Sequence, residues 1–212
     1  ILSSEAHVDA KKIRNATLRN QDNLAIIDAA SRIYEGKLYI QDTPNIRLLD
    51  LRSQARRMKR ERDIKILFID YISLINPEAN PNTPRHEQVA EVSRSLKALA
   101  RELEIPIVAL SQVTRDAEGK EPNLANLRDT GSIEQDADVV ILLHRDRIVD
   151  QSGQNDFRRE REEESPIVMG GFPVQKTKVI VAKQRNGETG IITMGFQNQL
   201  VRFVELDRME NS

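Results

Sequence analysis

The sequence contains no cysteine, so it can form neither a disulfide framework nor a thiolate metal site. Its three histidines, His7, His86 and His144, are far apart along the chain and have no metal-ligand spacing. These absences exclude a disulfide scaffold and give no support to a zinc site. They favour an intracellular protein, and we expect it to be cytoplasmic.

Long apolar runs are also missing. No stretch reaches the roughly 18 apolar residues that a helix needs to cross a bilayer, which excludes membrane insertion. The apolar fraction of 39% and the charged fraction of 31% are typical of a soluble globular protein. With 32 basic and 33 acidic residues the net charge is −1, which neither supports nor excludes nucleic-acid binding. A chain of 212 residues can form one sizeable core, and we expect one domain.

The N-terminus lacks the layout of a signal peptide and also lacks an initiator methionine. The chain opens at Ile1 within a polar helical pattern. We therefore expect these residues to be a fragment of a longer protein.

Helical periodicity marks several segments. Residues 3–34 carry apolar positions at mixed helical spacing with an interruption near Asn20 to Asn23, which predicts two helices joined by a polar turn. From Ile46, an apolar stripe alternates with many arginines and lysines and predicts a basic amphipathic helix. The clearest helix spans residues 86–103, whose apolar stripe comprises Val89, Val92, Leu96, Leu99 and Leu103.

Strands are expected between these helices. KLYIQD, residues 37–42, predicts a short strand. KILFIDYI, residues 65–72, and PIVALSQ, residues 106–112, show almost no alternation, which predicts strands buried on both faces in a parallel sheet covered by helices. Strand, helix and strand in this order form a right-handed βαβ unit, and DADVVILLH, residues 136–144, is expected to add a third strand.

The C-terminal third has a different character. Residues 150–165 are polar and densely charged, and we expect a mobile insertion or hairpin tip there. KVIVAKQRNGETGIITMGF, residues 178–196, then predicts a hairpin with Asn186, Gly187 and Gly190 as turn residues.

Polar residues that end apolar strands are the first functional candidates, because functional groups gather at the carboxyl ends of strands in open α/β sheets. Asp70 ends ILFID and could supply an oxygen ligand to Mg²⁺, or it could cap a helix or face solvent. Ser111 and Gln112 end PIVALSQ and could contact the terminal phosphate of a nucleotide, or simply start a loop.

Two further groups could bind anions. Lys183 and Arg185 lie two residues apart, which on a strand places both cations on one face, where they could grip an anion or form a solvated basic edge. Residues 126–138, NLRDTGSIEQDAD, contain Gly131, which allows close backbone approach to a ligand, and Arg128, which could hold a phosphodiester. The same stretch could also be an ordinary loop that caps a short helix.

The combination of LFIDYISLI, ALSQVTR, LRDTGSIEQDADVVILLHR and VIVAKQRNGETG, in this order, resembles the C-terminal motor domain of the DnaB-type replicative DNA helicases. The resemblance covers essentially the whole chain, including DTPNIRLLDLRSQARRMKRE and EVSRSLKALARELEIPIVAL. It implies a RecA-like α/β core with a mostly parallel sheet flanked by helices and a C-terminal antiparallel hairpin. Residues 1–212 would be the C-terminal part of one RecA-like ATPase domain, with a charged insertion at about residues 150–176.

The resemblance also implies a function. The protein would be an ATP-dependent DNA helicase whose homohexameric ring translocates on single-stranded DNA and unwinds duplex at the replication fork. ATP and Mg²⁺ would be its cofactors. Primase and a helicase loader would be its partners in replication, and no membrane would be involved.

Specific roles follow from the matching positions. Asp70 matches the Walker B aspartate that holds Mg²⁺, and Gln112 matches a glutamine that senses the γ-phosphate. Lys183 and Arg185 match a basic pair that each subunit offers to the nucleotide of its neighbour, with Arg185 as the arginine finger. These four residues are the predicted catalytic and nucleotide-binding residues.

The resemblance further assigns Arg128, Asp129 and Gly131 to a loop that contacts the DNA backbone near the channel axis. Contacts to the backbone carry no sequence information, which suits a motor that moves over any sequence. A ring needs positive potential only along its bore, so a net charge of −1 is compatible with this role.

Two parts of the family pattern are missing. The sequence contains no GxxxxGK[ST] phosphate loop, and it lacks the family's glutamate that polarises the attacking water. Both are expected upstream of Ile1, and the 212 residues alone are expected not to hydrolyse ATP. The alternatives are another RecA-like ATPase such as a recombinase, against which SIEQDAD and KQRNG argue, and a catalytically silent assembly module. The sequence before Ile1 would distinguish a motor from a silent module.

Overall fold

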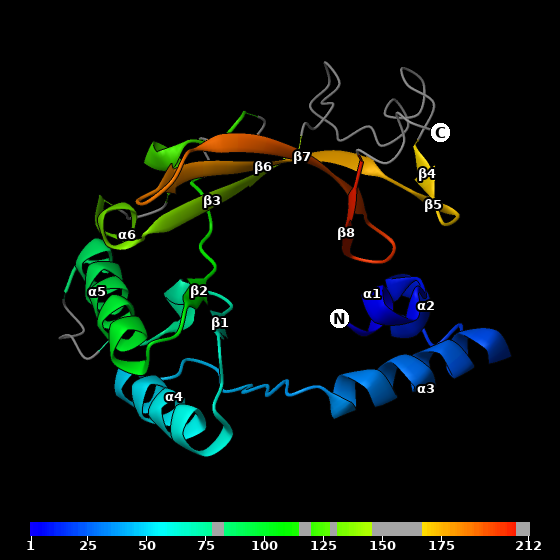
Figure 1. Ribbon diagram of the computed structural model, residues 1–212, viewed down its shortest axis with the longest axis horizontal. Helices are drawn as coiled ribbons and strands as arrows, with labels where there is room; N and C mark the ends of the chain where they lie inside the picture. The colour runs from blue at the N-terminus through cyan, green and yellow to red at the C-terminus, as the bar shows by residue number, and fades with distance from the viewer. Residues whose placement is uncertain (78–82, 115–119, 128–130, 146–166, 207–212) are drawn as a thin grey trace. The chain divides into compact units, whose positions relative to one another are not determined.

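The computed structural model describes residues 1–77, 83–114, 120–127, 131–145 and 167–206 (Figure 1). The chain forms two compact units. The first unit consists of Ile1–Gln41, Leu143–Ile180 and Ile191–Ser212, and the second of Asp42–Leu142 and Val181–Gly190. Among the residues described, no helix has both the length and the apolar character required to cross a membrane.

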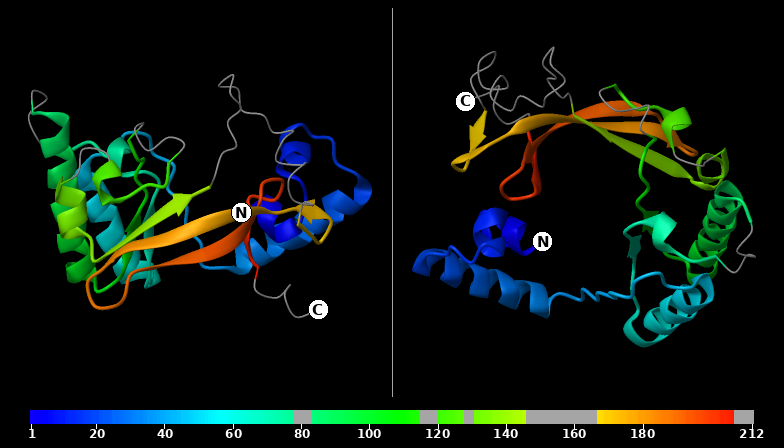
Figure 2. Two further views of the ribbon diagram at one scale, coloured as in Figure 1. Left: turned by 90° about the horizontal axis from the view of Figure 1, so that it is seen from above. Right: turned by 180° about the vertical axis from the view of Figure 1, so that it is seen from behind.

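The N-terminal region of the first unit contains three helices instead of the predicted two. They are α1 (Leu2–Ala6), α2 (Ala10–Arg14) and α3 (Asn20–Glu35). The chain breaks earlier than expected, at Ala16 with φ of 53°, and the polar residues from Asn20 form the first turn of α3. Asp22 explains the shift, because its carboxylate accepts a hydrogen bond from the Arg19 amide at 3.0 Å and so fixes the start of the helix. Helix α1 packs against α3 (Figures 1 and 2).

The β-structure of the first unit contacts the helical region through one of its turns. Strands β7 (Gly190–Gln197) and β8 (Arg202–Glu205) pair in antiparallel fashion. Phe196 and Phe203 lie opposite each other across the pair, with ring centroids 4.9 Å apart and ring planes tilted by 55°. The turn between the strands holds α2, since the Ala10 amide donates to the Gln199 carbonyl at 2.8 Å.

The prediction of a strand at residues 37–42 is wrong. These residues have no regular secondary structure, and Leu38, Tyr39 and Ile40 are exposed. An isolated strand needs a neighbour to complete its backbone hydrogen bonds. No strand among the described residues pairs with this segment, so its β-branched and aromatic composition does not produce a strand.

The second unit contains the predicted βαβ unit. Strands β1 (Leu67–Ile69) and β2 (Ile107–Ala109) are parallel, with Leu67 opposite Ile107 and Ile69 opposite Ala109. Helix α5 (Arg85–Leu103) connects them and confirms the predicted helix. Helix α4 (Leu48–Arg62) confirms the basic amphipathic helix. The shorter helices are η1 (Ile72–Leu74), η3 (Leu124–Asn126) and α6 (Gly131–Asp136).

The core of the second unit lies on one face of β1 and β2. Helices α4 and α5 both lie on this side of the strands (Figures 1 and 2) and bury their apolar stripes there. Ile69 packs in this core with Leu48 from α4 and Leu96 from α5. Phe68 and Val108 point to the other face and are 65% and 40% exposed. The prediction of burial on both faces is therefore wrong for the described residues, because both helices cover the same face.

The third predicted strand belongs to a different sheet. Strand β3 (Val139–His144) lies in a four-stranded sheet of order β3, β6, β7, β8, and the prediction that it joins β1 and β2 is wrong. Its burial alternates, with Val140 and Leu142 buried and Ile141 exposed, as expected for a strand with one covered face.

The predicted C-terminal hairpin is confirmed. Strand β6 (Gln175–Gln184) is hydrogen-bonded to β7, and residues 185–189 join them. Such a short connection requires an antiparallel pair, because a parallel crossover needs about a dozen residues or more.

The charged insertion predicted at residues 150–176 falls mostly outside the described residues, which resume at 167. Its last ten positions contain β4 (Val168–Met169), β5 (Phe172–Pro173) and the start of β6. Strands β4 and β5 form a small antiparallel pair.

Candidate functional site

Asp70 and Gln112 follow the two parallel strands at the same edge. Asp70 comes directly after β1, and Gln112 lies three residues beyond β2. Leu110 connects the two strand ends, because its amide donates to the Ile69 carbonyl and its carbonyl accepts from the Ile72 amide, both at 2.9 Å. Asp70 and Gln112 are both exposed and therefore available to a ligand. The alternative that Asp70 faces solvent is compatible with this exposure.

The chain beyond Gln112 is fixed against the segment that precedes the predicted DNA loop. Val113 forms an antiparallel bridge with Leu127, and the Thr114 amide donates to the Asn126 carbonyl at 2.8 Å. Gln112 thus lies between the end of β2 and a bridge to Leu127. This arrangement gives a direct backbone connection from the predicted phosphate-sensing glutamine to the residue before Arg128.

Of the predicted DNA-binding residues, Arg128 and Asp129 lie outside the described residues. Gly131 is described and is the first residue of α6. The structure therefore leaves the DNA-binding role of all three residues as a prediction.

Lys183 lies near the end of β6, where its Nζ donates to the carbonyl oxygens of Glu134 at 2.5 Å and Gln135 at 3.5 Å. These carbonyls belong to the last turn of α6. A cation is favourable there because the carbonyl groups at a helix C-terminus lack partners and carry partial negative charge.

Arg185 follows β6 and is held by Asp138. The Arg185 amide donates to the Asp138 carbonyl at 2.8 Å, and its guanidinium forms an ion pair with the Asp138 carboxylate at 3.1 Å. The side chain of Arg185 remains 48% exposed. Lys183 and Arg185 therefore both contact one segment of the chain, residues 134–138. The sequence predicted both cations on one face of a strand, but β6 ends at Gln184 and Arg185 follows it. The anion-binding role of the pair stays a prediction.

Asp138 was not singled out from the sequence, although it stands directly before the apolar run VVILLH, which forms β3. It also forms an ion pair with Lys97 of α5. The hydrogen bond from Lys97 is the main cause that lowers the pKa of the Asp138 carboxyl, and the positive charges of Lys97, Arg185 and Arg101 act in the same direction. Asp138 is thus held in its charged form.

Among the described residues of the candidate site, a metal ion could be held only by a single carboxylate such as that of Asp70. No group of three or more histidine, cysteine, aspartate or glutamate residues is arranged for a metal within the described part of the chain. Mg²⁺ is compatible with this, because it commonly uses one or two carboxylates and takes its other ligands from phosphates and water. Asp70 fits such a role as an exposed oxygen donor at a strand end.

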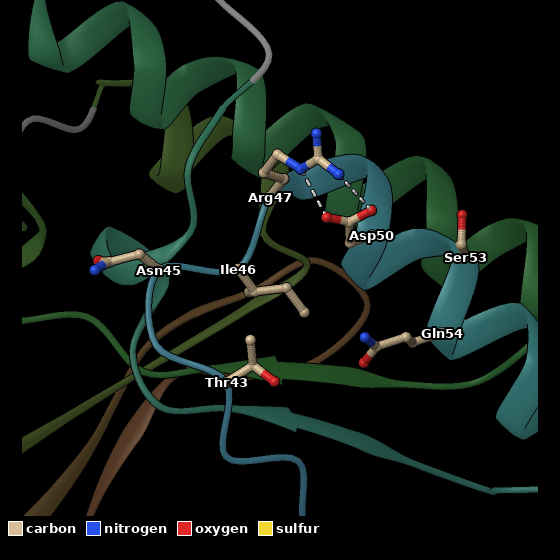
Figure 3. Close-up of a pocket in the computed structure, with 7 residues that line it drawn as sticks. All are labelled: Thr43, Asn45, Ile46, Arg47, Asp50, Ser53 and Gln54. Atoms are coloured by element: carbon tan, nitrogen blue, oxygen red, sulfur yellow. Dashed lines mark hydrogen bonds and ion pairs between the residues drawn. The ribbon is translucent and has the colours of Figure 1, made fainter.

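A hollow of about 350 Å³ lies elsewhere in the second unit, beside the start of α4 (Figure 3). Arg47 and Asp50 form an ion pair at its edge, with a distance of 2.7 Å. None of the predicted site residues lines it. Its lining consists of Thr43, Asn45, Ile46, Arg47, Asp50, Ser53 and Gln54.

Parallel strands next to a helix-covered core define an α/β protein, the class in which ligands bind at the carboxyl ends of the strands. The family described as the DnaB-like helicase C terminal domain matches residues 1–205. This chain belongs to that family, and its fold is the RecA-like α/β fold expected from the sequence.

Curated relatives of this family are similar to the chain over nearly its whole length. The chain is 47% identical over 204 residues to the replicative DNA helicase DnaB of Treponema pallidum, covering 96% of this chain and 41% of that protein. It is 37% identical over 211 residues to the DnaB helicase of Geobacillus stearothermophilus, covering 98% of this chain and 42% of that protein. The chain thus spans about two fifths of the length of these curated relatives.

Solved structures show the same similarity. One of them, described as an ATPase domain, superposes with a TM-score of 0.77 at 28% identity, covering 97% of this chain and 68% of that domain. A DnaB-like replicative helicase whose structure was described with its interactions with primase also has a TM-score of 0.77 at 28% identity, covering 97% of this chain and 47% of that protein.

Proposed function

We propose that this chain is part of the motor domain of an ATP-dependent replicative DNA helicase, and that its two compact units belong to one RecA-like ATPase domain. In this proposal a homohexameric ring translocates on single-stranded DNA in the cytoplasm and unwinds duplex at the replication fork. The observation that carries the proposal is the placement of Asp70 and Gln112 at the same edge of two parallel strands, tied together through Leu110. Family membership supports it.

Asp70 would hold the Mg²⁺ of the bound nucleotide. The ion neutralises charge on the phosphates during transfer. Gln112 would contact the γ-phosphate from the neighbouring strand end. The bridge between Val113 and Leu127 would pass a shift of Gln112 to Leu127, the residue before the proposed DNA contact Arg128, because backbone hydrogen bonds join the two segments.

Lys183 and Arg185 would act on the nucleotide of the adjacent subunit. A cation that reaches the transferring phosphoryl group stabilises the charge that develops there. The half-exposed guanidinium of Arg185 is compatible with such a contact. The cation arrives from a second subunit, so hydrolysis would depend on ring assembly.

Arg128, Asp129 and Gly131 would contact the DNA backbone. Gly131 begins α6, and the last turn of α6 holds Lys183, so one short helix separates the proposed DNA contact from the proposed catalytic cation. Primase and a helicase loader are the proposed protein partners. A DnaB-like relative of known structure is described with its interactions with primase.

The isolated 212-residue chain is expected to have no ATPase activity, whereas the full-length protein hydrolyses ATP and is stimulated by single-stranded DNA. The reason is that the sequence lacks a phosphate loop, so Asp70 has no cradle for the triphosphate beside it. Phosphate release by the purified chain is compared with that of its Asp70→Ala variant. Turnover above this control would contradict the expectation, and a full-length protein without DNA-stimulated hydrolysis would overturn the proposed function.

Replacing Arg128 with alanine in the full-length protein is expected to weaken single-stranded DNA binding by a similar factor for all sequences. The slope of log affinity against log salt concentration should become less steep by about 0.7, as expected for the loss of one phosphate contact on a single strand. Fluorescence anisotropy with several oligonucleotides at several salt concentrations measures both quantities. Arg60→Ala, on the exposed surface of α4, is the control and should leave the slope unchanged. A loss confined to particular sequences would contradict the role.

A further inference from the structure

Asp138 contacts cations from two different elements. Its Oδ2 binds the Lys97 ammonium on α5, and its Oδ1 lies 3.1 Å from the Arg185 guanidinium that follows β6. Arg101, one turn further along α5, adds positive charge nearby. The carboxylate therefore uses one oxygen for each partner and links α5 to the hairpin.

The backbone strengthens this link. The Arg185 amide donates to the Asp138 carbonyl at 2.8 Å, so Arg185 and Asp138 are joined through main chain and side chain at once. Two residues earlier, Lys183 donates to the last turn of α6. Residues 134–138 thus anchor both cations of the hairpin.

We propose that Asp138 is a positioning residue for Arg185, with Lys97 holding the carboxylate in the orientation that sets the guanidinium. This inference rests on the proposed function, in which Arg185 stabilises the phosphoryl group of the adjacent subunit's nucleotide. Lys97, Asp138 and Arg185 together carry a net charge of +1. Asp138 can therefore restrain Arg185 without removing the positive charge that the phosphoryl group requires.

The ion pair between Asp138 and Arg185 is about half exposed, and pairs of this kind contribute little to stability. Its effect is restriction of the guanidinium, because a catalytic cation is effective only when its position is set before the charge develops. Lys97 is attached to a rigid part of α5 and can therefore hold the Asp138 carboxylate in one orientation. It follows Leu96, which is buried in the same apolar cluster as Ile69, the residue before Asp70.

The test uses the Asp138→Asn variant of the full-length protein. Asparagine keeps the size of the side chain but removes the charge that binds Lys97 and Arg185 together. We expect kcat for DNA-stimulated ATP hydrolysis to fall about tenfold, while KM for ATP and ring assembly stay unchanged, because a displaced finger loses part of its effect of about 10³ to 10⁵. Asp138→Glu should recover part of the loss, and Lys97→Met should lower kcat in the same direction.

Two comparisons separate positioning from a general structural effect. Glu102→Gln breaks a similarly exposed ion pair of α5, with Arg56 at 2.5 Å, and is expected to leave kcat unchanged. In an Arg185→Ala background, Asp138→Asn should cause no further loss, because Asp138 acts through Arg185.

Wild-type kcat in both Asp138→Asn and Lys97→Met would overturn the inference, as would an additional loss in the Arg185→Ala background. If Asp138→Asn does not fold, as judged by circular dichroism, Lys97→Met alone decides between the two outcomes. Failure of the proposed function would look different, since the wild-type protein would then show no DNA-stimulated hydrolysis at all.

Discussion

A full-length protein carrying Arg185→Ala is expected to bind ATP normally, yet to lose DNA-stimulated hydrolysis by about 10³-fold or more and to unwind no duplex. Arg185 is half exposed, and its ion pair with Asp138 is of the kind that contributes little to stability, so its removal is expected to leave the fold of its own subunit intact. In the proposed role, the variant would lose the cation at the transferring phosphoryl group. Nucleotide affinity, steady-state hydrolysis and strand separation measure the three effects. Arg57→Ala, on the exposed side of α4, is the matched control.

Mixing two inactive variants shows whether Arg185 acts across an interface. Rings assembled from equal amounts of Arg185→Ala and Asp70→Asn subunits contain intact sites only if Asp70 and Arg185 come from different subunits. An intact site needs its Asp70 from an Arg185→Ala subunit and its Arg185 from an Asp70→Asn neighbour. Random assembly of equal amounts therefore restores about a quarter of the sites. Recovery of hydrolysis on mixing is the expected result. Rings that stay inactive, or unwinding by a uniform Arg185→Ala ring, would argue against the assignment.

Replacing Asp70 with asparagine is expected to lower Mg²⁺-dependent hydrolysis strongly in the full-length protein at every Mg²⁺ concentration tested. A neutral amide has nearly the shape of the carboxylate but lacks the charge that a hard cation prefers. The loss corresponds to several kcal/mol of transition-state stabilisation, or roughly a thousandfold in rate. Hydrolysis is measured over a Mg²⁺ titration, together with nucleotide binding in the absence of the metal, which should change little.

Asp63→Asn provides the comparison for this variant. Asp63 is also an exposed aspartate of the second unit, but it ends α4, where it pairs with Lys59 and Lys65. Those two lysines lower the pKa of the Asp63 carboxyl and favour its charged form. Its replacement should leave hydrolysis unchanged. Substantial activity in Asp70→Asn would remove Asp70 from the metal site.

The strand ends of the candidate site could be predicted from the sequence because their signals are local. Asp70 and Gln112 each follow a short apolar run, and both runs form parallel strands that end at the same edge. The helix between them was equally clear, since its apolar stripe repeats at helical spacing and is buried in the structure. Local pattern and tertiary packing agree in this part of the chain.

The role of Asp138 could not be predicted, because it depends on contacts between residues far apart in the sequence. Asp138 meets Lys97 and Arg185 only after β3 lies beside β6 and α5 packs against α6. The prediction that β3 joins the sheet of β1 and β2 was wrong for the same reason. An apolar run shows that a strand forms, but its partners are decided by packing that a single sequence does not display.

The hydrogen bonds of Leu110 have a consequence for the thermodynamics of ligand binding. They hold the main chain on both sides of Asp70, at Ile69 and at Ile72. The backbone freedom of this carboxylate is therefore lost when the protein folds. In the proposed role, a metal–nucleotide complex that binds later would have to order only the side-chain torsions of Asp70. If Asp70 holds the metal as proposed, this preorganisation would make the entropy of metal binding less unfavourable than it would be for a carboxylate on a loose loop.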